Sequence, residues 1–341
     1  LAGQMTGTKT AGDGALHKSG PGNLFLRGAT LAGSVVVAQG PLRLVEDLLD
    51  GGGTLRLLDR AMLTSSNATA RTVVKPVAIE GDVALGALGT YRGPLFLTNA
   101  VDLAGGARAI AVSNVVTISG VLSNGGLIKT APGTMTVSAV NTYLGATEIN
   151  GGVLVVSGSA ANSAHTVNSG GILRGAGIVG PLSIWGLVDP ANDGNSVGAL
   201  TADGTVALND TGTLKIDMPR ATGVAGTDWD LLAANGTVNV PPSGKFVLWV
   251  TGAAAGFDPG INQNWKIIDG PAVSSFDADR FLVDVTGFAP NLYNGTFGVS
   301  NDVANGYGTQ AAADGQVFTG TWVNGCYRDG SRWATAGVSA Q

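Results

Sequence analysis

Four oxygen-bearing side chains gather within seven positions: Asp189, Asn192, Asp193 and Asn195. Carboxylate and amide oxygens are the ligands that calcium prefers. The spacing differs from that of an EF-hand loop, and the glycine-aspartate nonapeptide of calcium-binding β-rolls is absent. Asn and Asp in turns also bond to their own backbone without a metal. The segment is therefore a weak calcium candidate, and an Asx-rich turn is the favoured interpretation.

Two further patterns could serve hydrolysis. Asp228 and Asp230 would share a face of a strand, and paired carboxylates hydrolyse glycosides. Only His17 and His165 could act as the base of a Ser-His-Asp triad, and no G-x-S-x-G elbow accompanies them. Solvent-facing acids and exposed strand histidines explain the same residues. We therefore assign no catalytic residue and predict that the protein is not an enzyme.

Residues 175–180 spell the dinucleotide fingerprint G-x-G-x-x-G. That fingerprint needs a following helix whose N-terminus holds the pyrophosphate, but Pro181 follows and no helical pattern is readable. The glycines fit turns instead, and no cofactor is predicted.

The tryptophans all lie beyond residue 184. Exposed tryptophans stack on sugars, but aromatic side chains more often form the core of a domain. A core role is favoured, with glycan binding as the alternative. The six are Trp185, Trp229, Trp249, Trp265, Trp322 and Trp333.

The single cysteine, Cys326, excludes an internal disulfide and leaves a free thiol or a bond between chains. With only two histidines besides, a Cys/His zinc site is not supported. Asn-x-Thr glycosylation sequons are weak evidence of modification. They begin at Asn67, Asn209, Asn235 and Asn294.

Composition limits the class of protein. Glycine supplies 54 of 341 residues, charged residues are 13% and the net charge is −5, which argues against nucleic-acid binding. No apolar run reaches the roughly 18 residues that a membrane span needs. Short apolar runs between Gly, Asn and Ser, such as 115–119 and 153–156, predict strands. Residues 42–49 are a weaker helix candidate.

A block of about thirty residues occurs twice. Residues 16–22 match 127–133 in their Leu, Lys, Pro and Gly positions, at an offset of 127 − 16 = 111. Further on, Gly40 and Leu42 match Gly152 and Leu154. Strands this short bury a core only by stacking successive coils, which is the logic of a β-solenoid.

The second copy resembles a known bacterial repeat. Its segments GLIKT (126–130), GTMTV (133–137) and NTYLGATEINGGVL (141–154) resemble the autotransporter-associated β-strand repeat, also called the passenger-associated transport repeat. The first copy lacks the Asn-Thr-Tyr. The resemblance implies a secreted or surface-displayed β-helix and implies no enzyme. Because the chain starts in what looks like the middle of a unit, we expect a piece of a larger precursor.

These observations predict an all-β fold: a β-solenoid, as a right-handed parallel β-helix, followed by a β-sandwich-like C-terminal domain. The solenoid is expected over residues 1–200, with repeat copies at about 14–45 and 126–156. The rise in aromatic content predicts a β domain or cap over 201–310, and the small polar residues of 311–341 predict an irregular tail.

The predicted function is structural. We expect a non-catalytic extracellular or cell-surface protein, a rod or subunit of a surface fibre that joins copies of itself head to tail. An adhesin or glycan-binding passenger domain is the alternative. A polysaccharide lyase or hydrolase is less favoured, although β-helices host such enzymes.

Overall fold

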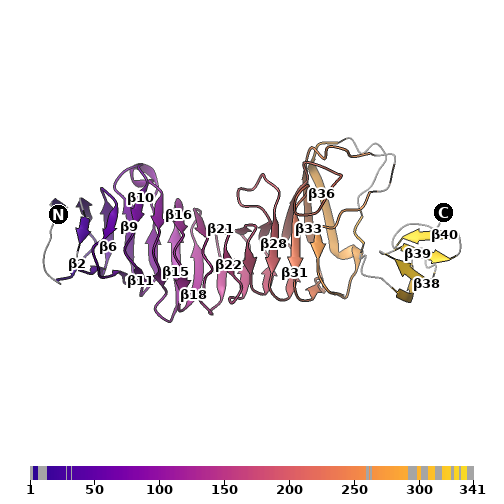
Figure 1. Ribbon diagram of the computed structural model, residues 1–341, viewed down its shortest axis with the longest axis horizontal. Coiled ribbons are helices and arrows are strands. Elements are labelled where there is room, and N and C mark those ends of the chain that lie inside the picture. Colours follow the sequence, from indigo (N-terminus) through magenta and orange to yellow (C-terminus); the bar gives the residue numbers. More distant parts are fainter. Residues whose placement is uncertain are drawn as a thin grey trace.

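The computed structural model describes residues 14–27, 29–31, 33–258, 261, 263–290 and 298–300, together with the strands β1 and β37–β40. Short strands wind into a column of stacked coils, seen side-on in Figure 1. All pairings from β1 to β36 are parallel, consistent with a right-handed β-helix. Among the described residues, the only helices are the single 3₁₀ turns η1 (Gly89–Tyr91) and η2 (Ala278–Arg280).

Two long sheets run the length of the column. The 13-stranded sheet contains, in spatial order, β1 (Gly3–Thr6), β3 (Leu24–Arg27), β6 (Gly40–Leu44), β9 (Ala61–Ser65), β12 (Val83–Leu85), β15 (Ala107–Val112), β18 (Gly126–Thr130), β20 (Thr147–Ile149), β23 (His165–Val167), β26 (Leu182–Ile184), β29 (Val206–Leu208), β32 (Val238–Asn239) and β35 (Val273–Ser274). The 12-stranded sheet contains β4 (Ala29–Leu31), β7 (Leu48–Asp50), β10 (Arg71–Val73), β13 (Leu95–Leu97), β16 (Val115–Ile118), β19 (Thr134–Val137), β21 (Gly152–Val156), β24 (Gly171–Arg174), β27 (Leu187–Asp189), β30 (Thr213–Asp217), β33 (Phe246–Gly252) and β36 (Phe281–Phe288).

The third face of the coil is divided between two shorter sheets. The six-stranded sheet holds β2 (Leu16–Lys18), β5 (Val35–Val37), β8 (Leu55–Leu57), β11 (Val77–Ile79), β14 (Val101–Asp102) and β17 (Leu122–Ser123). The five-stranded sheet holds β22 (Ser159–Ala160), β25 (Ile178–Val179), β28 (Ala199–Ala202), β31 (Leu231–Ala234) and β34 (Ile268–Asp269). The coil between β17 and β22 has no third-face strand, so the repeat at 127–156 falls at this interruption.

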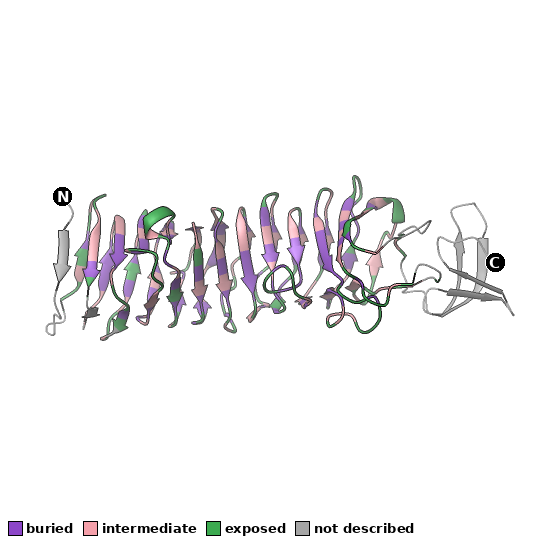
Figure 2. Ribbon diagram, turned by 90° about the horizontal axis from the view of Figure 1, so that it is seen from above, coloured by how far each residue is buried: buried purple, intermediate pink, exposed green. Residues whose placement is uncertain are grey.

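The core is one continuous apolar cluster inside the column. Alternation along each strand sends every second side chain inward, and parallel register stacks like on like. Leu42 is in register with Leu63, and Leu63 with Leu85. Figure 2 shows buried residues along the whole described column. The axial stacking that the sequence predicted is therefore what buries the core.

The predicted boundary near residue 200 is not a boundary in the sheets. Strands β28 to β36 extend the same parallel sheets, so the described residues of 199–288 add coils rather than a separate sandwich. The aromatic residues lie in wider coils and longer loops: Phe257 stacks on Trp265 with ring centroids 6.2 Å apart and meets Phe288 at 5.3 Å. Higher aromatic content reflects larger coils to fill, not a new fold.

Two local expectations also differ from the structure. The helix candidate at 42–49 spans parts of two strands, β6 and β7. The predicted tail contains an antiparallel sheet of β37 (Gly306–Ala311), β38 (Val317–Val323), β39 (Cys326–Asp329) and β40 (Arg332–Thr335). Glycines interrupt the pattern of β37 and β38, and β39 and β40 have only four residues each, which is why no strand was expected there. Within the described chain, no helix has the length and apolarity needed to cross a membrane.

Candidate functional site: the repeat and a buried polar cluster

Buried lysines close the turns of the repeat. Lys129 in β18 is fully buried, and its Nζ donates to the carbonyls of Thr130 (3.0 Å), Ala131 (2.8 Å) and Gly151 (2.9 Å). The first two oxygens belong to its own turn and the third to the turn of the next coil. Burial lowers the pKa of Lys129 to about 8. The ammonium thus ties two coils together, and its hydrogen-bond partners among the described residues are backbone carbonyls.

The first copy repeats this device on another face of the coil. The Nζ of Lys18 in β2 donates to Gly20 O at 2.6 Å and to Gln39 O at 2.8 Å. Lys18 belongs to a strand of the six-stranded sheet, whereas Lys129 belongs to a strand of the 13-stranded sheet. The two copies are therefore shifted by one face around the column, and the chemistry of the turn is the same at both corners.

Asn141 replaces the missing third-face strand. Its Oδ1 accepts the backbone N–H of Leu122 at 2.9 Å, and its Nδ2 donates to Ala139 O at 3.0 Å and Ser159 O at 2.9 Å. Leu122 belongs to the preceding coil and Ser159 to the following one. One buried carboxamide therefore bridges three coils where the ladder is interrupted.

A chain of hydroxyl groups lies beside this bridge. Tyr143 Oη is 2.8 Å from Thr147 Oγ1, which is 2.8 Å from Ser163 Oγ. Ser163 Oγ donates to Gly145 O at 2.8 Å. Burial raises the pKa of Tyr143, so its hydroxyl stays protonated and can donate. The Asn-Thr-Tyr of the repeat thus supplies both the bridge and the start of a buried polar chain.

His165 is buried, not exposed as the sequence analysis expected; His17 is exposed. The Nδ1 of His165 is 2.7 Å from Ser163 O, and its Nε2 has no hydrogen-bond partner among the described residues. Burial lowers its pKa to about 4. The ring is therefore neutral near pH 7, and its partner is a backbone carbonyl rather than a serine hydroxyl.

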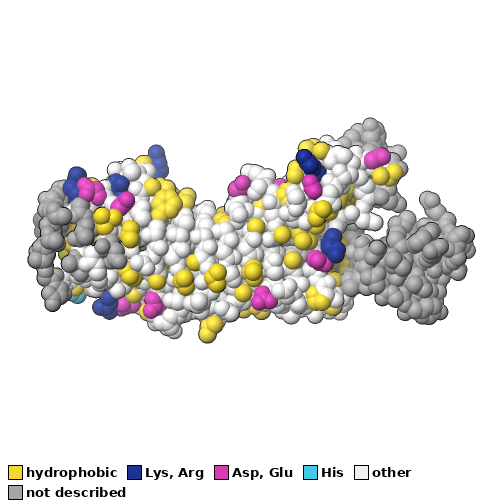
Figure 3. Space-filling model, in the orientation of Figure 1, with side chains coloured by type: hydrophobic (Ala, Val, Ile, Leu, Met, Phe, Trp, Pro, Cys, Tyr) yellow, Lys and Arg dark blue, Asp and Glu magenta, His cyan; other side chains and the backbone are white. Residues whose placement is uncertain are grey.

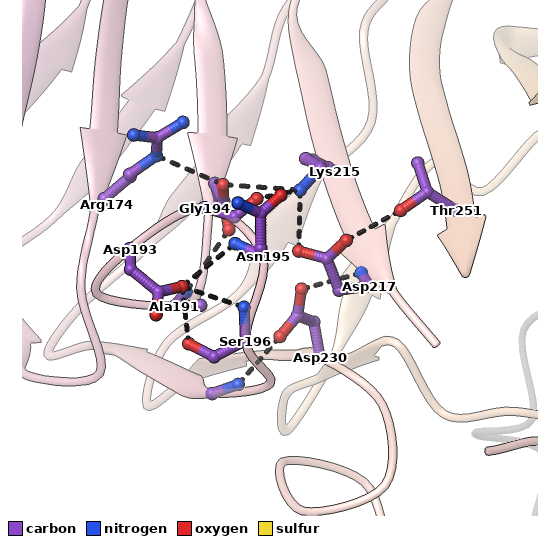
Figure 4. A network of polar contacts seen from close by, with 12 residues as sticks. Arg174, Ala191, Asp193, Gly194, Asn195, Ser196, Lys215, Asp217, Asp230 and Thr251 are labelled. Atoms are coloured by element: carbon purple, nitrogen blue, oxygen red, sulfur yellow. Dashed lines mark hydrogen bonds and ion pairs between the residues drawn. The ribbon is translucent and has the colours of Figure 1, made fainter. Parts of the chain in front are cut away.

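A second cluster of polar groups lies on the outer side of the 12-stranded sheet (Figure 4). The Nζ of Lys215 donates to Asp217 Oδ2 at 2.6 Å and lies 3.8 Å from Asp189 Oδ2. Arg174 Nε donates to the same Asp189 oxygen at 3.2 Å. Asp189, Lys215 and Asp217 are buried, and the loops 190–198 and 218–230 contact them: Lys215 Nζ donates to the carbonyl oxygen of Gly194, and Asp230 accepts from the backbone of Asp217.

Asp230 joins the cluster to the backbone of the loop 190–198 and of strand β30. Its Oδ1 accepts the N–H of Gly198 at 2.7 Å, and its Oδ2 accepts the N–H of Asp217 at 2.8 Å. Burial raises the pKa of Asp230 to about 7, against the opposing effect of these two donors. Ligand oxygens of Asp189, Asp217 and Asp230 lie within 4.8 Å of one another, a spacing that could hold a metal. The Lys215 ammonium contacts Asp189 and Asp217 and, together with Arg174, offsets the charge of these two carboxylates.

The proposed calcium ligands do not converge. Only Asp189 is in the buried cluster; Asn192 Oδ1 accepts the N–H of Ala176 at 3.3 Å. Asp193 Oδ1 accepts from Asn195 N at 2.9 Å, and from Ser196 N and Ser196 Oγ at 2.8 Å. This is the geometry of an Asx-rich turn. The calcium candidate thus remains without support from the arrangement of its four residues.

The suggested acid pair is also divided. Asp228 Oδ2 accepts the N–H of Val224 at 2.9 Å in the loop, whereas Asp230 faces the cluster. Sequence reasoning did not select Lys215 or Asp217, although a signal was present. In β30 the apolar Leu214 and Ile216 alternate with these charged residues, and all four are buried. Charged residues at the outward positions of a strand are normally exposed to solvent. Where they are buried instead, they indicate a layer of polar contacts between the sheet and the loops above it.

The other sequence candidates have structural roles where they are described. Residues 175–180 form a close turn and the short β25, with no helix after them. Trp229 Nε1 donates to Lys266 O at 2.9 Å and Trp265 Nε1 to Ala221 O at 2.8 Å, while Trp185 is 42% exposed.

The glycosylation sequons and the cysteine are the remaining candidates that the sequence analysis singled out. Asn67 Oδ1 accepts the N–H of Thr69 at 2.8 Å, which makes an exposed Asx-turn. Asn209 and Asn235 donate to Ser183 Oγ and Asp203 Oδ1, each at 3.0 Å. The remaining candidates lie outside the residues whose side chains are described: Asn294, Trp322, Cys326 and Trp333.

One comparison with known proteins gives a match. Residues 127–156 match the family model of the passenger-associated-transport-repeat, which confirms the predicted resemblance of the second copy. The matched segment contains Lys129, Asn141 and Tyr143, the residues that close its turns and bridge its coils. No curated protein matches the chain.

Proposed function

We propose that this chain is a non-catalytic, extracellular structural segment, a rod displayed on a bacterial cell surface. The observation that carries the proposal is the unbroken apolar core inside parallel sheets of 13 and 12 strands. Hydrogen bonds along the axis join every coil to the next, so the column resists bending. The transport repeat at 127–156 supports an exported passenger.

The polar clusters support a structural role over a catalytic one. The polar side-chain atoms of Lys129 and Asn141 form hydrogen bonds with backbone groups of neighbouring coils. Lys215 pairs with carboxylates that lie beneath loops. These groups reinforce the column rather than converge on a place for substrate.

The rod is tested by small-angle scattering and electron microscopy of the purified chain. Twelve strands spaced about 4.8 Å apart predict a parallel column about 55 Å long. We expect the asymmetric distance distribution of an elongated particle, with a peak near the width of the column and a tail toward its length, whereas a compact protein of 34.0 kDa gives a symmetric one. A scattering curve typical of a sphere contradicts the proposal.

We further propose that copies join head to tail. In the described part of the chain, β36 ends the 12-stranded sheet on one side and β4 on the other. An end strand presents backbone N–H and C=O groups that can pair with another chain. Leu282 in β36 is 51% exposed, so an apolar side chain accompanies this edge.

Sedimentation velocity over a range of concentrations tests the association. Wild-type chain is expected to form linear oligomers, and Leu282→Lys is expected to reduce them because a lysine on an end strand blocks pairing. Leu144→Lys, at a 77% exposed position in the middle of the column, serves as the control. A wild-type monomer at all concentrations contradicts head-to-tail assembly and leaves the rod untouched.

A further inference from the structure

A row of asparagines runs along one corner of the column, and a tryptophan interrupts it. The residues directly after β20, β23, β26 and β29 each donate a backbone N–H to the preceding coil. The acceptors are Lys129 O for Asn150 (2.9 Å), Ile149 O for Asn168 (3.0 Å), Val167 O for Trp185 (2.8 Å) and Ile184 O for Asn209 (3.1 Å). Equivalent bonds place these four residues on successive coils, about 4.8 Å apart. We call them the corner row.

Trp185 is the most exposed of the tryptophans whose side chains are described, at 42%. Trp229 is buried, and its indole N–H donates to a carbonyl. No such bond is found for the indole N–H of Trp185 within the described part of the chain. Leaving a large aromatic surface in water costs hydrophobic free energy that an asparagine at this position would not cost. The exposure points to a ligand that covers the ring.

The side-chain amide nitrogens of the neighbouring asparagines, Asn168 and Asn209, donate hydrogen bonds within the protein. Asn168 Nδ2 donates to Asn150 Oδ1 at 2.6 Å. Asn209 Nδ2 donates to Ser183 Oγ at 3.0 Å and to Ala207 O at 3.2 Å. Within the described part of the chain, these bonds leave the carboxamide oxygens of Asn168 and Asn209 as acceptors on the coils to either side of Trp185. Hydroxyl groups are the donors that suit them.

The charge of the side chains around the corner row indicates which class of hydroxyl-bearing ligand suits it. None of the four residues of the corner row is charged. The nearest ionisable side chains along the chain are acidic: Glu148 on β20 and Asp210 directly after Asn209. Figure 3 shows one face of the molecule, on which the lysine and arginine side chains lie toward the two ends of the described part. Such surroundings disfavour an acidic polysaccharide and accept a neutral one.

We propose that the corner row binds a neutral glycan, with one pyranose ring stacked on the indole of Trp185. Sugar hydroxyls donate to the carboxamide oxygens of Asn168 and Asn209, and the indole N–H donates to a further hydroxyl. The repeating coils let successive sugar units lie along the axis. Binding at this corner does not depend on polymerisation of the rod.

Binding is measured with the full chain by isothermal titration calorimetry. The neutral probes are cellohexaose, laminarihexaose, maltohexaose and mannohexaose, and the acidic probe is a galacturonate hexamer. We expect at least one neutral probe to bind and the acidic one not to bind. Trp185→Ala should weaken binding about tenfold, the equivalent of one stacked ring, and Trp185→Phe by less than about threefold.

Val224→Ala is the matched control, because Val224 is an exposed apolar residue in a different loop. It should leave affinity unchanged. The proposal is overturned if none of the neutral probes binds, if the acidic hexamer binds more tightly, or if Trp185→Ala binds as wild type does. Scattering of Trp185→Ala should still give the wild-type rod, which separates loss of the glycan site from loss of the fold.

Discussion

The Nζ of Lys129 lies 2.9 Å from the carbonyl oxygen of Gly151, in the next coil of the column. Two more carbonyls of its own turn complete the set of acceptors. In the first copy Lys18 has the same relationship to Gln39, at 2.8 Å. The lysine that both copies share is thus an internal cross-link between coils, not a surface charge.

Replacing Lys129 by methionine should destabilise the protein. The variant keeps the aliphatic packing but leaves three carbonyls without their donor, and a buried unsatisfied polar group costs about 1–3 kcal/mol. Because a desolvated charge is also removed, we expect a net loss of about 2 kcal/mol in the free energy of unfolding. Urea denaturation measures it.

Lys266→Met is the matched control for this experiment. Lys266 is exposed and pairs with Asp269 at 3.1 Å. Exposed ion pairs contribute about 0–1 kcal/mol, so this variant should be nearly neutral. Equal effects at Lys129 and Lys266 would contradict the cross-link.

Gly152 should tolerate no side chain. It has φ +65°, and a Cβ would lie 2.5 Å from the carbonyl oxygens of Ala131 and Gly133 in the preceding coil. Gly152→Ala therefore forces two coils apart, and we expect a loss of more than about 3 kcal/mol. Gly170 also has a positive φ, +87°, but has nothing within 4 Å of a Cβ. Gly170→Ala should cost only about 1 kcal/mol, from backbone strain alone. Thermal unfolding of the two variants separates crowding from strain.

Asn141→Ala tests the bridge at the interrupted face. The change removes hydrogen bonds to the coils on both sides, including the bond to the N–H of Leu122 at 2.9 Å. We expect a loss of about 3 kcal/mol, because several buried backbone groups lose partners together. Asn150→Ala, at an exposed position on a corner, should cost less than about 1 kcal/mol. Hydrogen exchange at Leu122 should accelerate only in the Asn141 variant.

Features that depend on interactions within one coil could be predicted from the sequence, whereas features that depend on contacts between residues far apart in the sequence could not. Strand alternation and the repeated Gly and Lys positions predicted the solenoid, because both act within one coil. The burial of His165 was missed although the sequence held a signal: Val167 is apolar, and alternation along β23 puts His165 on the same inward side. The pairing of Lys215 with Asp189 was not readable. This pairing depends on which residues of successive coils come into register. The loop 190–198 separates the strands of these coils, and strand alternation does not predict the length of such a loop.

The misplaced domain boundary has a related cause. Aromatic residues after position 184 were interpreted as a second core, but Phe246 and Phe281 meet edge to face inside the same column, 6.4 Å apart. Composition reports how much volume a coil must fill. It does not report whether that coil continues the sheet before it.

Two buried groups should give the stability opposing pH dependences between about pH 4 and 7. The pKa of His165 is lowered to about 4, so the unfolded chain binds its proton first and stability falls as pH drops from 6.5. The pKa of Asp230 is raised to about 7, so the folded chain keeps that proton and stability falls as pH rises. Each effect amounts to about 3–4 kcal/mol at most, and in the wild type they largely cancel.

A single substitution at either residue should reveal how the free energy of unfolding depends on the titration of the other. Relative to the wild type, His165→Leu is expected to lose stability from pH 4 to pH 7, because the opposing contribution of His165 is removed and that of Asp230 remains. Asp230→Asn is expected to gain stability relative to the wild type over the same range, because the contribution of His165 remains. Chemical denaturation at half-unit pH steps measures both. Parallel curves for the two variants would contradict the assignment.

Removing the ammonium of Lys215 should turn the buried cluster into a cation-dependent one. Lys215→Met leaves Asp189 and Asp217 buried without their nearest counter-charge, which typically costs about 3–5 kcal/mol. The loops 190–198 and 218–230 should then be cleaved faster by protease. Ligand oxygens of Asp189, Asp217 and Asp230 lie within 4.8 Å of one another, so calcium can replace the lost charge. We expect millimolar calcium to raise the melting temperature of Lys215→Met and to leave that of the wild type unchanged. A Lys215→Met variant that melts at the wild-type temperature would show that the cluster does not hold the loops.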